Sequence, residues 1–598
     1  MMKLTKDFKD NYTILIFILL IGLCVQSLCA QRFEHPRGIV QKTDVEILRA
    51  KVKHEPYSNM LQGITYQYQK LHSEGKWKKS NKGWAYPAAD LALVSAQLYL
   101  LTGENKWAQT SKEIVDQIIN DKETFLDPSY FGLTRAQSLL KVMMAYDFCY
   151  EAWGDTYAEI FTQKIYPIVF SMSASMGRSA NYDMASNWMG VRYGTVLFTS
   201  LIWDDFENGN EISKSSIAHL EFNAKKRIED FALANIHEDG WNVESLGYWA
   251  YGWSFVHPAL IAWTSKYDLG VERFSLNDRM VKAFQAAIVS FIPIKNLSTY
   301  GIKPDFSDDS TTWSSRWLPY GYHLAQGESK QYLRSALDLY NKQKDWTSVS
   351  DGAFENIVFS SSDDVRIDIP KTWKYFFSPG QGVAVTRNQF KDENDILVAF
   401  STTSHRRGHQ GGDNLSFRVI GLNNIWVVGA GRTNLTAGQS SFFPSKPDPD
   451  STRYEPELGT VNTQYYNNGE SFISAAGNAT GVDVHRRSMK VNMTEDSATI
   501  LVTDSSENGS IWRINTPEFN KVNILNDGFE IIGPNETKLI AKILTPFDKI
   551  ETGVNRYGGN TQRHNYGILY NGERYENTIY IDVHCDRNIE VKLELFKP

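Results

Sequence analysis

Cysteine is scarce in this sequence, and its placement suggests neither a metal site nor a disulfide framework. Of the four cysteines, Cys24 and Cys29 fall near the N-terminus, which leaves Cys149 and Cys585 for the rest of the chain. No Cys-x-x-Cys pair is present, so a zinc site made of thiolates is not expected. Cys149 falls in a predicted helix and Cys585 in a predicted strand, so we expect two buried free thiols.

The sequence also lacks a strong excess of charge of one sign and a second long apolar run. It has 62 basic and 69 acidic residues and a net charge of -7, which argues against a general nucleic-acid binder. Beyond the N-terminal segment no apolar stretch is long enough for a membrane helix. Aromatic residues, by contrast, make up 13% of the chain. Because aromatic rings stack on sugars but also fill large cores, this richness permits a carbohydrate-handling protein without requiring one.

Residues 1–30 predict a signal peptide. Three lysines precede an apolar run at 13–25, and Ala30 supplies a small residue before a cleavage point. The run is too short to cross a bilayer comfortably. We therefore expect the mature chain to be exported, either secreted or periplasmic, without a membrane span.

The hydrophobic period divides the rest of the chain into two halves, since 598 residues are too many for one compact core. Residues 31–347 show helical spacing with short breaks, which predicts an α/α toroid that forms an incomplete barrel. Residues 348–369 predict a linker. Residues 370–598 show a period of two with turn signals, which predicts an antiparallel β-sandwich. The expected fold class is therefore α+β and multidomain.

The strongest patterns give the expected elements. The clearest helical patterns lie at 88–101, 135–153, 195–203, 216–234 and 278–292. The clearest strand patterns lie at 396–401, 415–421, 425–428, 498–504, 538–544, 577–583 and 589–596. Helices thus precede strands throughout, an order that few groups of exported enzymes share.

Three segments carry residue types suited to catalysis. Asn187 precedes a predicted helix, the segment 239–252 contains Tyr248, and the segment 405–417 contains His409. Each of these residues has an ordinary structural explanation when it is considered alone. An Asn before a helix is commonly an N-cap, a Tyr in a Trp-rich helix is commonly part of a core, and a His in a turn is commonly hydrogen-bonded.

Together and in this order, the segments resemble the heparinase II/III-like polysaccharide lyases and the related exolytic alginate lyases. The second-domain pattern of that family is approximately His-x-His-x-Asp-x-x-x-Phe, of which His409, Asp413 and Phe417 are present. Asn187 and Tyr248 stand where the helical-domain pattern has its Asn and its Tyr. The resemblance implies a catalytic set of Asn187, Tyr248 and His409, and the coincidence of three segments favours this interpretation over separate structural explanations.

Family lyases cleave uronic-acid glycans by β-elimination, and these residue types suit that reaction. An Asn amide with a His or Arg can stabilise the charge that develops on the uronate as the C5 proton leaves. A base must take that proton and an acid must protonate the leaving O4. Tyr248 serves both roles if they lie on one face of the sugar; otherwise His409 is the base and Tyr248 is the acid. Tyr251 is an alternative to Tyr248.

Basic and aromatic side chains around these segments are expected to bind an anionic polysaccharide. A tyrosine is a poor base unless positive charge lies nearby, and the cluster at 405–407 supplies such charge. Arg418, Arg486 and Arg487 add further guanidinium groups, which pair with carboxylates and sulfates. The expected substrate-binding residues are Trp188, Arg192, Glu244, Trp249, Tyr251, His405, Arg406, Arg407, Asp413 and Arg432.

A metal or other cofactor is not expected. Many family members bind zinc in the second domain, but Gly411 and Gly429 stand where the family has a His and an Asp ligand. His485 is the only histidine near the place of the later ligand, and it lies in a basic strand. Because zinc needs three or four convergent ligands, the sequence predicts a metal-independent enzyme.

Two functions of other classes are compatible with the same residues. A glycoside hydrolase on an α/α toroid would need an Asp/Glu pair, available among Glu238, Asp239, Glu244, Asp305, Asp308 and Asp309. A non-catalytic glycan-binding protein is the third candidate, favoured if the Tyr and His are buried. For a lyase, ulvan, alginate and glycosaminoglycans all fit as substrates, endo and exo attack both fit, and the oligomeric state is left open.

Overall fold

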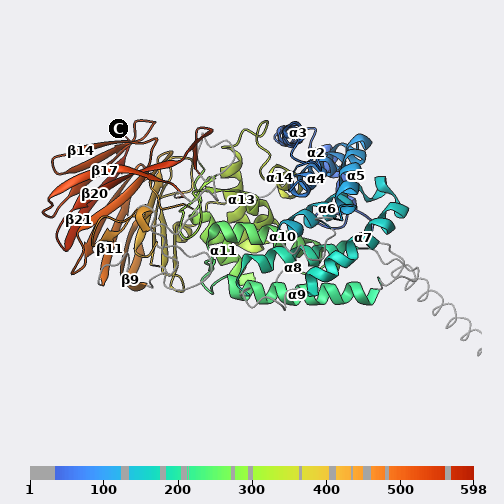
Figure 1. Ribbon diagram of the computed structural model, residues 1–598, viewed down its shortest axis with the longest axis horizontal. Coiled ribbons are helices and arrows are strands. Elements are labelled where there is room, and N and C mark those ends of the chain that lie inside the picture. The colour runs from blue at the N-terminus through green and yellow to red at the C-terminus, as the bar shows by residue number, and fades with distance from the viewer. Residues whose placement is uncertain are drawn as a thin grey trace, which may run out of the picture.

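The computed structural model has a helical half followed by a half built from β-sheets (Figure 1). The predicted signal peptide, residues 1–30, lies outside the residues that the structure describes. The described residues are 34–81, 83–122, 125, 133–174, 184–203, 212, 214–270, 277–293, 301–361, 367–402, 413–431, 436–448, 459–477, 484–558 and 567–597.

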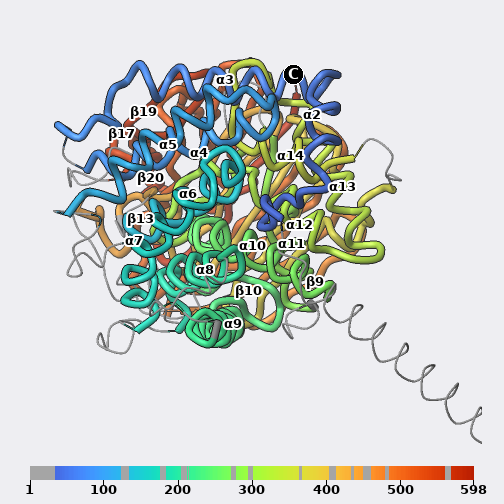
Figure 2. Tube along the Cα trace, turned by 90° about the vertical axis from the view of Figure 1, so that its right-hand side faces the viewer, coloured from blue at the N-terminus to red at the C-terminus, as the bar shows by residue number. Residues whose placement is uncertain are grey.

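Inner helices of the helical half pack against one another in chain order, as in a toroid (Figure 2). They are α4 (Ala85–Thr102), α6 (Leu133–Trp153), α8 (Asn187–Ile202), α10 (Leu246–Tyr267) and α12 (Trp317–Leu324). The other helices are α2 (Val45–Lys51), α3 (Tyr57–Glu74), α5 (Asn105–Ile119), α7 (Asp155–Ala174), α9 (Lys214–Asn235), α11 (Asn277–Val289), α13 (Gly327–Asn341) and α14 (Ala353–Phe359). This arrangement confirms the predicted α/α toroid.

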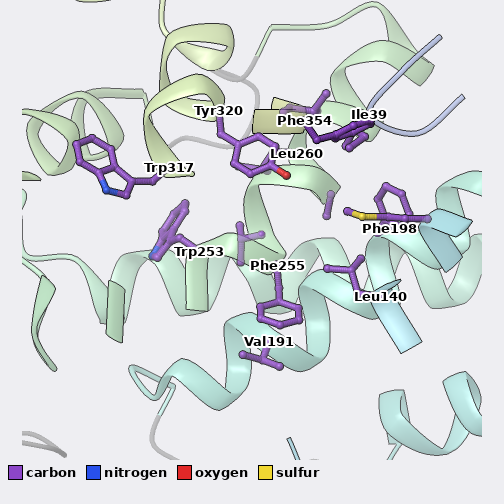
Figure 3. Close-up of a cluster of buried hydrophobic side chains, with 14 of the residues drawn as sticks. Ile39, Leu140, Val191, Phe198, Trp253, Phe255, Leu260, Trp317, Tyr320 and Phe354 are labelled. Atoms are coloured by element: carbon purple, nitrogen blue, oxygen red, sulfur yellow. The ribbon is translucent and has the colours of Figure 1, made fainter. Parts of the chain in front are cut away.

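The inner helices are apolar on nearly every face because neighbours cover them on all sides. Outer helices such as α5 and α13 instead bury one stripe of residues, which is the usual amphipathic pattern. Side chains from α6, α8, α10, α12 and α14 meet in one core, shown in Figure 3 by Leu140, Phe198, Trp253, Leu260, Tyr320 and Phe354. The toroid is therefore held together chiefly by this shared apolar core.

Helix α8 begins at Asn187, eight residues before the pattern that predicted it at 195–203. Glycines interrupt the apolar pattern in its first half. A Cβ at Gly194 would lie 2.5 Å from the Phe255 carbonyl oxygen of α10, and one at Gly190 would lie 2.8 Å from the Phe231 ring of α9. The glycines thus allow α8 to approach its neighbours closely, at some cost in helix propensity.

The second half contains three larger antiparallel sheets. One consists in chain order of β3 (Tyr375–Ser378), β4 (Val383–Arg387), β5 (Ile396–Ser401), β6 (Ser416–Gly421) and β7 (Asn424–Val427). Another has the order β14 (Lys521–Leu525), β15 (Gly528–Ile532), β16 (Lys538–Ile543), β21 (Asn588–Phe596), β12 (Ser497–Ser505), β11 (His485–Met493), β10 (Glu470–Gly477), β9 (Gly459–Asn467). The third has the order β17 (Lys549–Arg556), β20 (Asn577–His584), β13 (Ile511–Pro517), β8 (Phe442–Phe443).

These sheets pack face to face around a second apolar core. The Val428 N–H donates to the Asn515 carbonyl at 3.0 Å, which joins the end of β7 to β13. Trp426 of β7, Trp512 of β13 and Val502 of β12 contribute to the core between the layers. The predicted antiparallel β-sandwich is confirmed, and every strand pattern named from the sequence coincides with a strand to within one residue at either end.

The predicted linker at 348–369 is wrong in its middle part. Residues 353–359 form α14, which packs against α3 and α12. Phe354 and Ile357 are buried in the toroid core, so this segment completes the helical half. The serine-rich flank suggested a linker. The apolar pattern between 353 and 359 is only two turns long, so it did not indicate a helix.

A short hairpin and a buried arginine connect the two halves. The hairpin of β1 (Gly301–Ile302) and β2 (Thr312–Trp313) carries a loop, residues 303–311, that extends to the β-sandwich. At a second place Arg387 of β4 donates to the carbonyls of Ile288 and Phe291, at 3.1 and 2.5 Å, where α11 ends. Arg387 also pairs with Asp395 at 2.6 Å, and both side chains are fully buried.

Two expectations about single segments can be compared with the structure. Cys149 of α6 and Cys585, just after β20, are both buried free thiols, as predicted. Among the described helices, none combines the length and the apolar composition that a bilayer crossing requires.

Candidate active site

Asn187 is the first residue of α8 and is held by Glu244 from the segment before α10. The Asn187 backbone N–H donates to Glu244 Oε2 at 2.8 Å, and its amide Nδ2 donates to Oε1 at 3.3 Å. Ser186, not Asn187, is the N-cap, since its Oγ accepts from the Trp188 N–H. The alternative explanation of Asn187 as a helix cap is therefore wrong.

A buried network of amides supports Glu244 from behind. The Asn242 side-chain oxygen accepts from the backbone N–H groups of Glu244 and Ser245, at 2.9 and 3.2 Å. Asn242 in turn donates to Asn235, which donates to the Ala185 carbonyl at 2.6 Å. The chain just before α8 and the chain just before α10 are thus fixed to each other. Asn187 Oδ1 is buried and has no hydrogen-bond partner among the described residues, which leaves an acceptor available for a ligand.

Tyr248 lies in the first turn of α10, on the face that meets α8. Its backbone N–H donates to the Ser245 side chain, which caps the helix. Gly252, one turn further, is so close to α8 that a Cβ there would lie 3.4 Å from the Asn187 Cα. Residues four apart share one helix face, so Tyr248 and Gly252 lie on the same side. The half-buried Tyr248 hydroxyl donates to Asp308 Oδ2 at 3.1 Å.

The loop that carries Asp308 is anchored to the toroid through Asp309. Asp309 Oδ2 accepts from the fully buried Lys303 ammonium at 2.5 Å and from the Gly247 N–H at 2.8 Å. A side chain at Gly247 would collide with Asp309, since its Cβ would lie 2.2 Å from Oδ1. Glycine at this place therefore lets the loop reach the start of α10.

The same loop is anchored to the β-sandwich through Asp305. Asp305 Oδ1 accepts from Arg418 Nε at 2.5 Å, and the Gly429 N–H and the Tyr557 hydroxyl donate to the same carboxylate at 3.0 and 2.9 Å. Ser307 donates its backbone N–H to Asp413 Oδ2 at 3.1 Å. Asp413 belongs to the predicted second-domain motif, so this motif and Tyr248 are brought to the same loop.

Burial changes the acidity of Asp413. Its side chain is enclosed, and removal from water raises the pKa of the carboxyl to about 6, although Arg418 partly offsets the shift. Asp413 Oδ1 has no hydrogen-bond partner among the described residues. Both observations show that the ionised form of the Asp413 carboxyl is poorly stabilised. The same carboxyl supports the loop through its bond to Ser307.

Some of the predicted substrate-binding residues lie beside this site. Trp188 is half-buried, and the guanidinium of Arg192, a residue that is only 6% exposed, lies over its ring at 5.3 Å from the centroid. Tyr251 is half-buried on the second turn of α10, and its hydroxyl bonds to Gln137 of α6. Tyr251 therefore lies toward α6, away from the loop that holds Tyr248.

Other predicted binding residues are corrected by their burial. Trp249 is only 2% exposed and packs against Trp313 and Trp317, so it belongs to the toroid core. Glu244 and Asp413 are enclosed by the bonds described above and support the site from within. The sequence did not separate these residues from Tyr248 because all of them lie in the same short motifs.

The predicted arginine cluster is only partly available to a substrate. Arg418 is fully buried with Asp305, and Arg487 is fully buried with Asp504, to which it donates at 2.7 and 2.8 Å. These two arginines are structural, and the prediction that they bind substrate is wrong. Arg486 is exposed.

Several predicted residues lie outside the part of the chain that the structure describes. They are His405, Arg406, Arg407, His409, Gly411 and Arg432. Asp413 is the first described residue after 403–412, so the structure describes this motif only from Asp413 to Phe417.

The described residues contain no cluster of three His, Cys, Asp or Glu side chains that could hold a metal ion. Gly429, at the position of a family zinc ligand, faces the Arg418 guanidinium, and a Cβ there would lie 2.1 Å from Arg418 Nη2. His485 is buried and bonds to Asp504 at 2.6 Å. Gly429 and His485 are thus each in contact with a partner of a buried ion pair, Arg418 and Asp504.

The sequence offered the loop 303–311 only as a source of acids for a hydrolase. Glu244, Asp305 and Asp309 are each occupied by the buried bonds described above. Asp239 accepts from the Ser378 hydroxyl at 2.7 Å, and Glu238 is almost fully exposed beside Arg279. The three acids within 305–309 could have indicated a functional loop. Most of the residues that bond to them lie far away in the sequence, so the sequence did not show which acid contacts Tyr248.

Comparison with solved structures agrees with this architecture. A crystal structure of heparinase III superposes with a TM-score of 0.55 over 85% of this chain and 76% of that chain, at 11% identity. Heparan sulfate lyase HepC from Pedobacter heparinus superposes with a TM-score of 0.54 over 93% of this chain and 88% of that chain, at 12% identity. The chain has the heparinase III fold. No protein-family model and no curated protein matches its sequence, so the likeness to heparinase III is one of fold.

Proposed function

We propose that this protein is a polysaccharide lyase that cleaves an anionic, uronic-acid-containing polysaccharide by β-elimination. The observation that carries the proposal is the convergence of three distant segments on one place. Asn187 contacts the helix of Tyr248, Tyr248 bonds to the loop at Asp308, and the neighbouring Ser307 bonds to Asp413 of the second domain. The fold shared with heparinase III, a helical toroid followed by a β-sandwich, supports the proposal, because these segments come from both domains.

Each residue has a chemical task in this reaction. The Asn187 amide donates one Nδ2 hydrogen to Glu244, and its second Nδ2 hydrogen would donate to the uronate carboxyl and stabilise the charge that develops there. Tyr248 would exchange a proton with the sugar, and His409, in the same motif as Asp413, would be the second proton-transfer group or a carboxylate ligand. The product would carry a 4,5-unsaturated uronate at its new non-reducing end.

The surrounding residues would bind neighbouring sugars of the chain. Trp188 and Tyr251 offer half-buried aromatic faces, and Arg192 adds a guanidinium beside Trp188. His405, Arg406, Arg407 and Arg432 would supply further positive charge for carboxylates or sulfates. Glycosaminoglycan, alginate and ulvan substrates all meet these requirements, and we propose that the mature chain acts on them after export, without a metal cofactor.

The test is a panel of these polysaccharides incubated with the purified mature chain. Elimination creates a double bond that absorbs in the ultraviolet, whereas hydrolysis creates reducing ends without that absorbance. We expect absorbance to rise with at least one polysaccharide and the rise to be abolished in Tyr248→Phe. New reducing ends without ultraviolet absorbance would refute the proposal in favour of a hydrolase, and binding without any product would favour a glycan-binding protein.

The absence of a metal cofactor is tested on the same preparation. We expect elemental analysis to find less than stoichiometric zinc and the elimination rate to survive treatment with a chelator. Stoichiometric zinc together with chelator-sensitive activity would contradict this part of the proposal.

A further inference from the structure

The carboxylate of Asp308 is the described acceptor of the Tyr248 hydroxyl, at 3.1 Å. We propose that Asp308 is a positioning residue that orients this hydroxyl and takes up its proton while Tyr248 accepts the C5 proton of the substrate. The inference rests on the elimination reaction proposed above, and it assigns to Asp308 a task that no sequence motif indicated.

The position of Asp308 is set by both domains. The residue after it, Asp309, is tied to Lys303 and to the start of α10. The residue before it, Ser307, is tied to Asp413 of the β-sandwich. Because both neighbours are anchored by buried groups, the Asp308 carboxylate is held against the first turn of α10 at little further cost in conformational entropy.

The direction of the hydrogen bond decides what Tyr248 can do. A phenol has a single hydrogen, and here that hydrogen is donated to Asp308. In this arrangement the Tyr248 oxygen can act toward a sugar only as a proton acceptor. The geometry thus favours Tyr248 as the base that removes the C5 proton over Tyr248 as an acid alone.

The proposed proton transfer balances without a further reactant. As the C5–H bond breaks, its proton bonds to the Tyr248 oxygen and the phenol proton passes to Asp308. The C5 electron pair forms the C4=C5 double bond, and the C4–O4 bond breaks with its electrons on O4. Tyr248 then protonates O4 while Asp308 returns its proton to Tyr248, so the enzyme ends as it began.

Such a transfer removes the need for a phenolate. An ordinary tyrosine has a pKa near 10, so only about one molecule in a thousand is ionised at neutral pH. With a carboxylate as acceptor, a neutral Tyr248 can take the C5 proton as it loses its own. The rate then does not depend on ionising Tyr248 beforehand.

Several charged groups surround Asp308 and would also titrate. On its own loop these are Lys303, Asp305 and Asp309, and the groups that anchor this loop or lie before α10 are Asp413, Arg418 and Glu244. All of them stay unchanged in a variant of Asp308 alone. The informative quantity is therefore the difference between the pH profiles of the variant and of the wild type.

The experiment measures kcat and KM of the full mature chain against pH, with the polysaccharide that gives the greatest ultraviolet change. We expect Asp308→Asn to lower kcat about 100-fold near neutral pH with little change in KM. We expect its rate to rise about tenfold per pH unit up to about pH 9, as a phenolate becomes necessary, while the wild type shows no such rise. Asp308→Glu, which retains a carboxylate, should restore part of the rate and the wild-type profile.

Asp116→Asn is the matched control, because Asp116 accepts from the Tyr157 hydroxyl at 2.7 Å between α5 and α7, away from the site. It should leave kcat and the pH profile unchanged. If Asp308→Asn does not fold, as judged by circular dichroism, Asp308→Ser replaces it with the same expected result.

The inference and the proposed function fail in different ways. An active wild type with an Asp308→Asn variant of equal rate, or of lower rate with an unchanged pH profile, would overturn the role of Asp308 alone. A wild type that makes no unsaturated product from any polysaccharide of the panel would overturn the elimination and the role of Asp308 with it.

Discussion

Among single residues, Asn187 shows how a partner from a distant segment, Glu244, fixes the orientation of an ordinary amide side chain. An Asn next to a helix start usually caps the helix, but here Ser186 performs that role and Glu244 holds the amide. The cap and the amide are adjacent in sequence, so only the partner across the fold distinguishes them. A buried Oδ1 without a partner among the described residues costs stability unless a ligand satisfies it.

Replacement of this amide should impair catalysis much more than folding. We expect Asn187→Ala to lower kcat/KM about 100-fold or more, because the stabilisation of the uronate charge is lost. The backbone bond from residue 187 to Glu244 remains, so the melting temperature should change little. Asn223→Ala on the outer helix α9 is the control and should retain full activity. An Asn187→Ala variant of normal activity would contradict the assignment.

Tyr251 is distinguished from Tyr248 by its partner on α6. Its hydroxyl bonds to Gln137, so we expect Tyr251 to help bind the substrate rather than to transfer a proton. Tyr251→Phe should therefore raise KM a few-fold and leave kcat nearly unchanged, as for a residue that binds the substrate and the transition state equally. The measurement is the full dependence of the elimination rate on substrate concentration. If Tyr251→Phe abolished kcat while Tyr248→Phe did not, the two tyrosines would have to exchange roles.

At the scale of elements, helix ends and loops position the site, while strands and helix middles build the cores. The first turns of α8 and α10 carry Asn187 and Tyr248, and the loop 303–311 joins them to the sandwich. On the other side of the junction, Arg387 of β4 satisfies the last carbonyls of α11. The carbonyls at a helix C-terminus need such partners, and a buried guanidinium supplies several donors at once.

Removal of Arg387 should therefore destabilise the junction. We expect Arg387→Met to lower the free energy of unfolding by about 3–5 kcal/mol, because Asp395 becomes a buried charge without its partner. The change can be measured as a lower urea midpoint. Arg556→Met removes a surface pair with Glu576 and should cost less than about 1 kcal/mol. Equal effects of the two substitutions would show that the Arg387 pair does not hold the junction.

At the scale of the whole molecule, the two domains meet around buried carboxyl groups whose ionisation is linked to stability. Burial raises the pKa of Asp413 to about 6 in the folded state, above the ordinary value of 3.8 that is expected in the unfolded chain. The folded state therefore binds the Asp413 proton more tightly. The contribution of this group to stability is fully present below about pH 4 and is lost as pH rises to about 6.

The stability of Asp413→Asn should follow this linkage. The amide cannot ionise, so we expect the variant to gain stability relative to the wild type as pH rises from about 4 to 6, by at most about 3 kcal/mol, with no further gain above that range. Melting temperatures measured between these pH values test the prediction. Asp586→Asn, at an exposed residue, is the control for the loss of a carboxylate at the surface. A constant difference for Asp413→Asn would refute the linkage.

The sequence predicted the fold class and the main elements because those depend on local periodicity. Apolar spacing identified the helices and strands, and it failed where the pattern was short or interrupted, as at 353–359 and in the first half of α8. Of the residues predicted for the site, Asn187 packs against Gly252 on the helix of Tyr248, whereas Trp249 and Arg418 are buried structural residues. Residue type and motif alone could not separate these cases, since burial is a property of the packed chain.

A helical toroid, an antiparallel sandwich and two free thiols could be predicted from the amino-acid sequence, because hydrophobic period and cysteine spacing are properties of neighbouring residues. That Glu244 holds Asn187 and that Asp308 accepts from Tyr248 is visible only in the folded chain. Those bonds join residues that lie about sixty positions apart or, for Ser307 and Asp413, about a hundred. Contacts over such distances arise when the cores of the two domains form, and no local pattern records them.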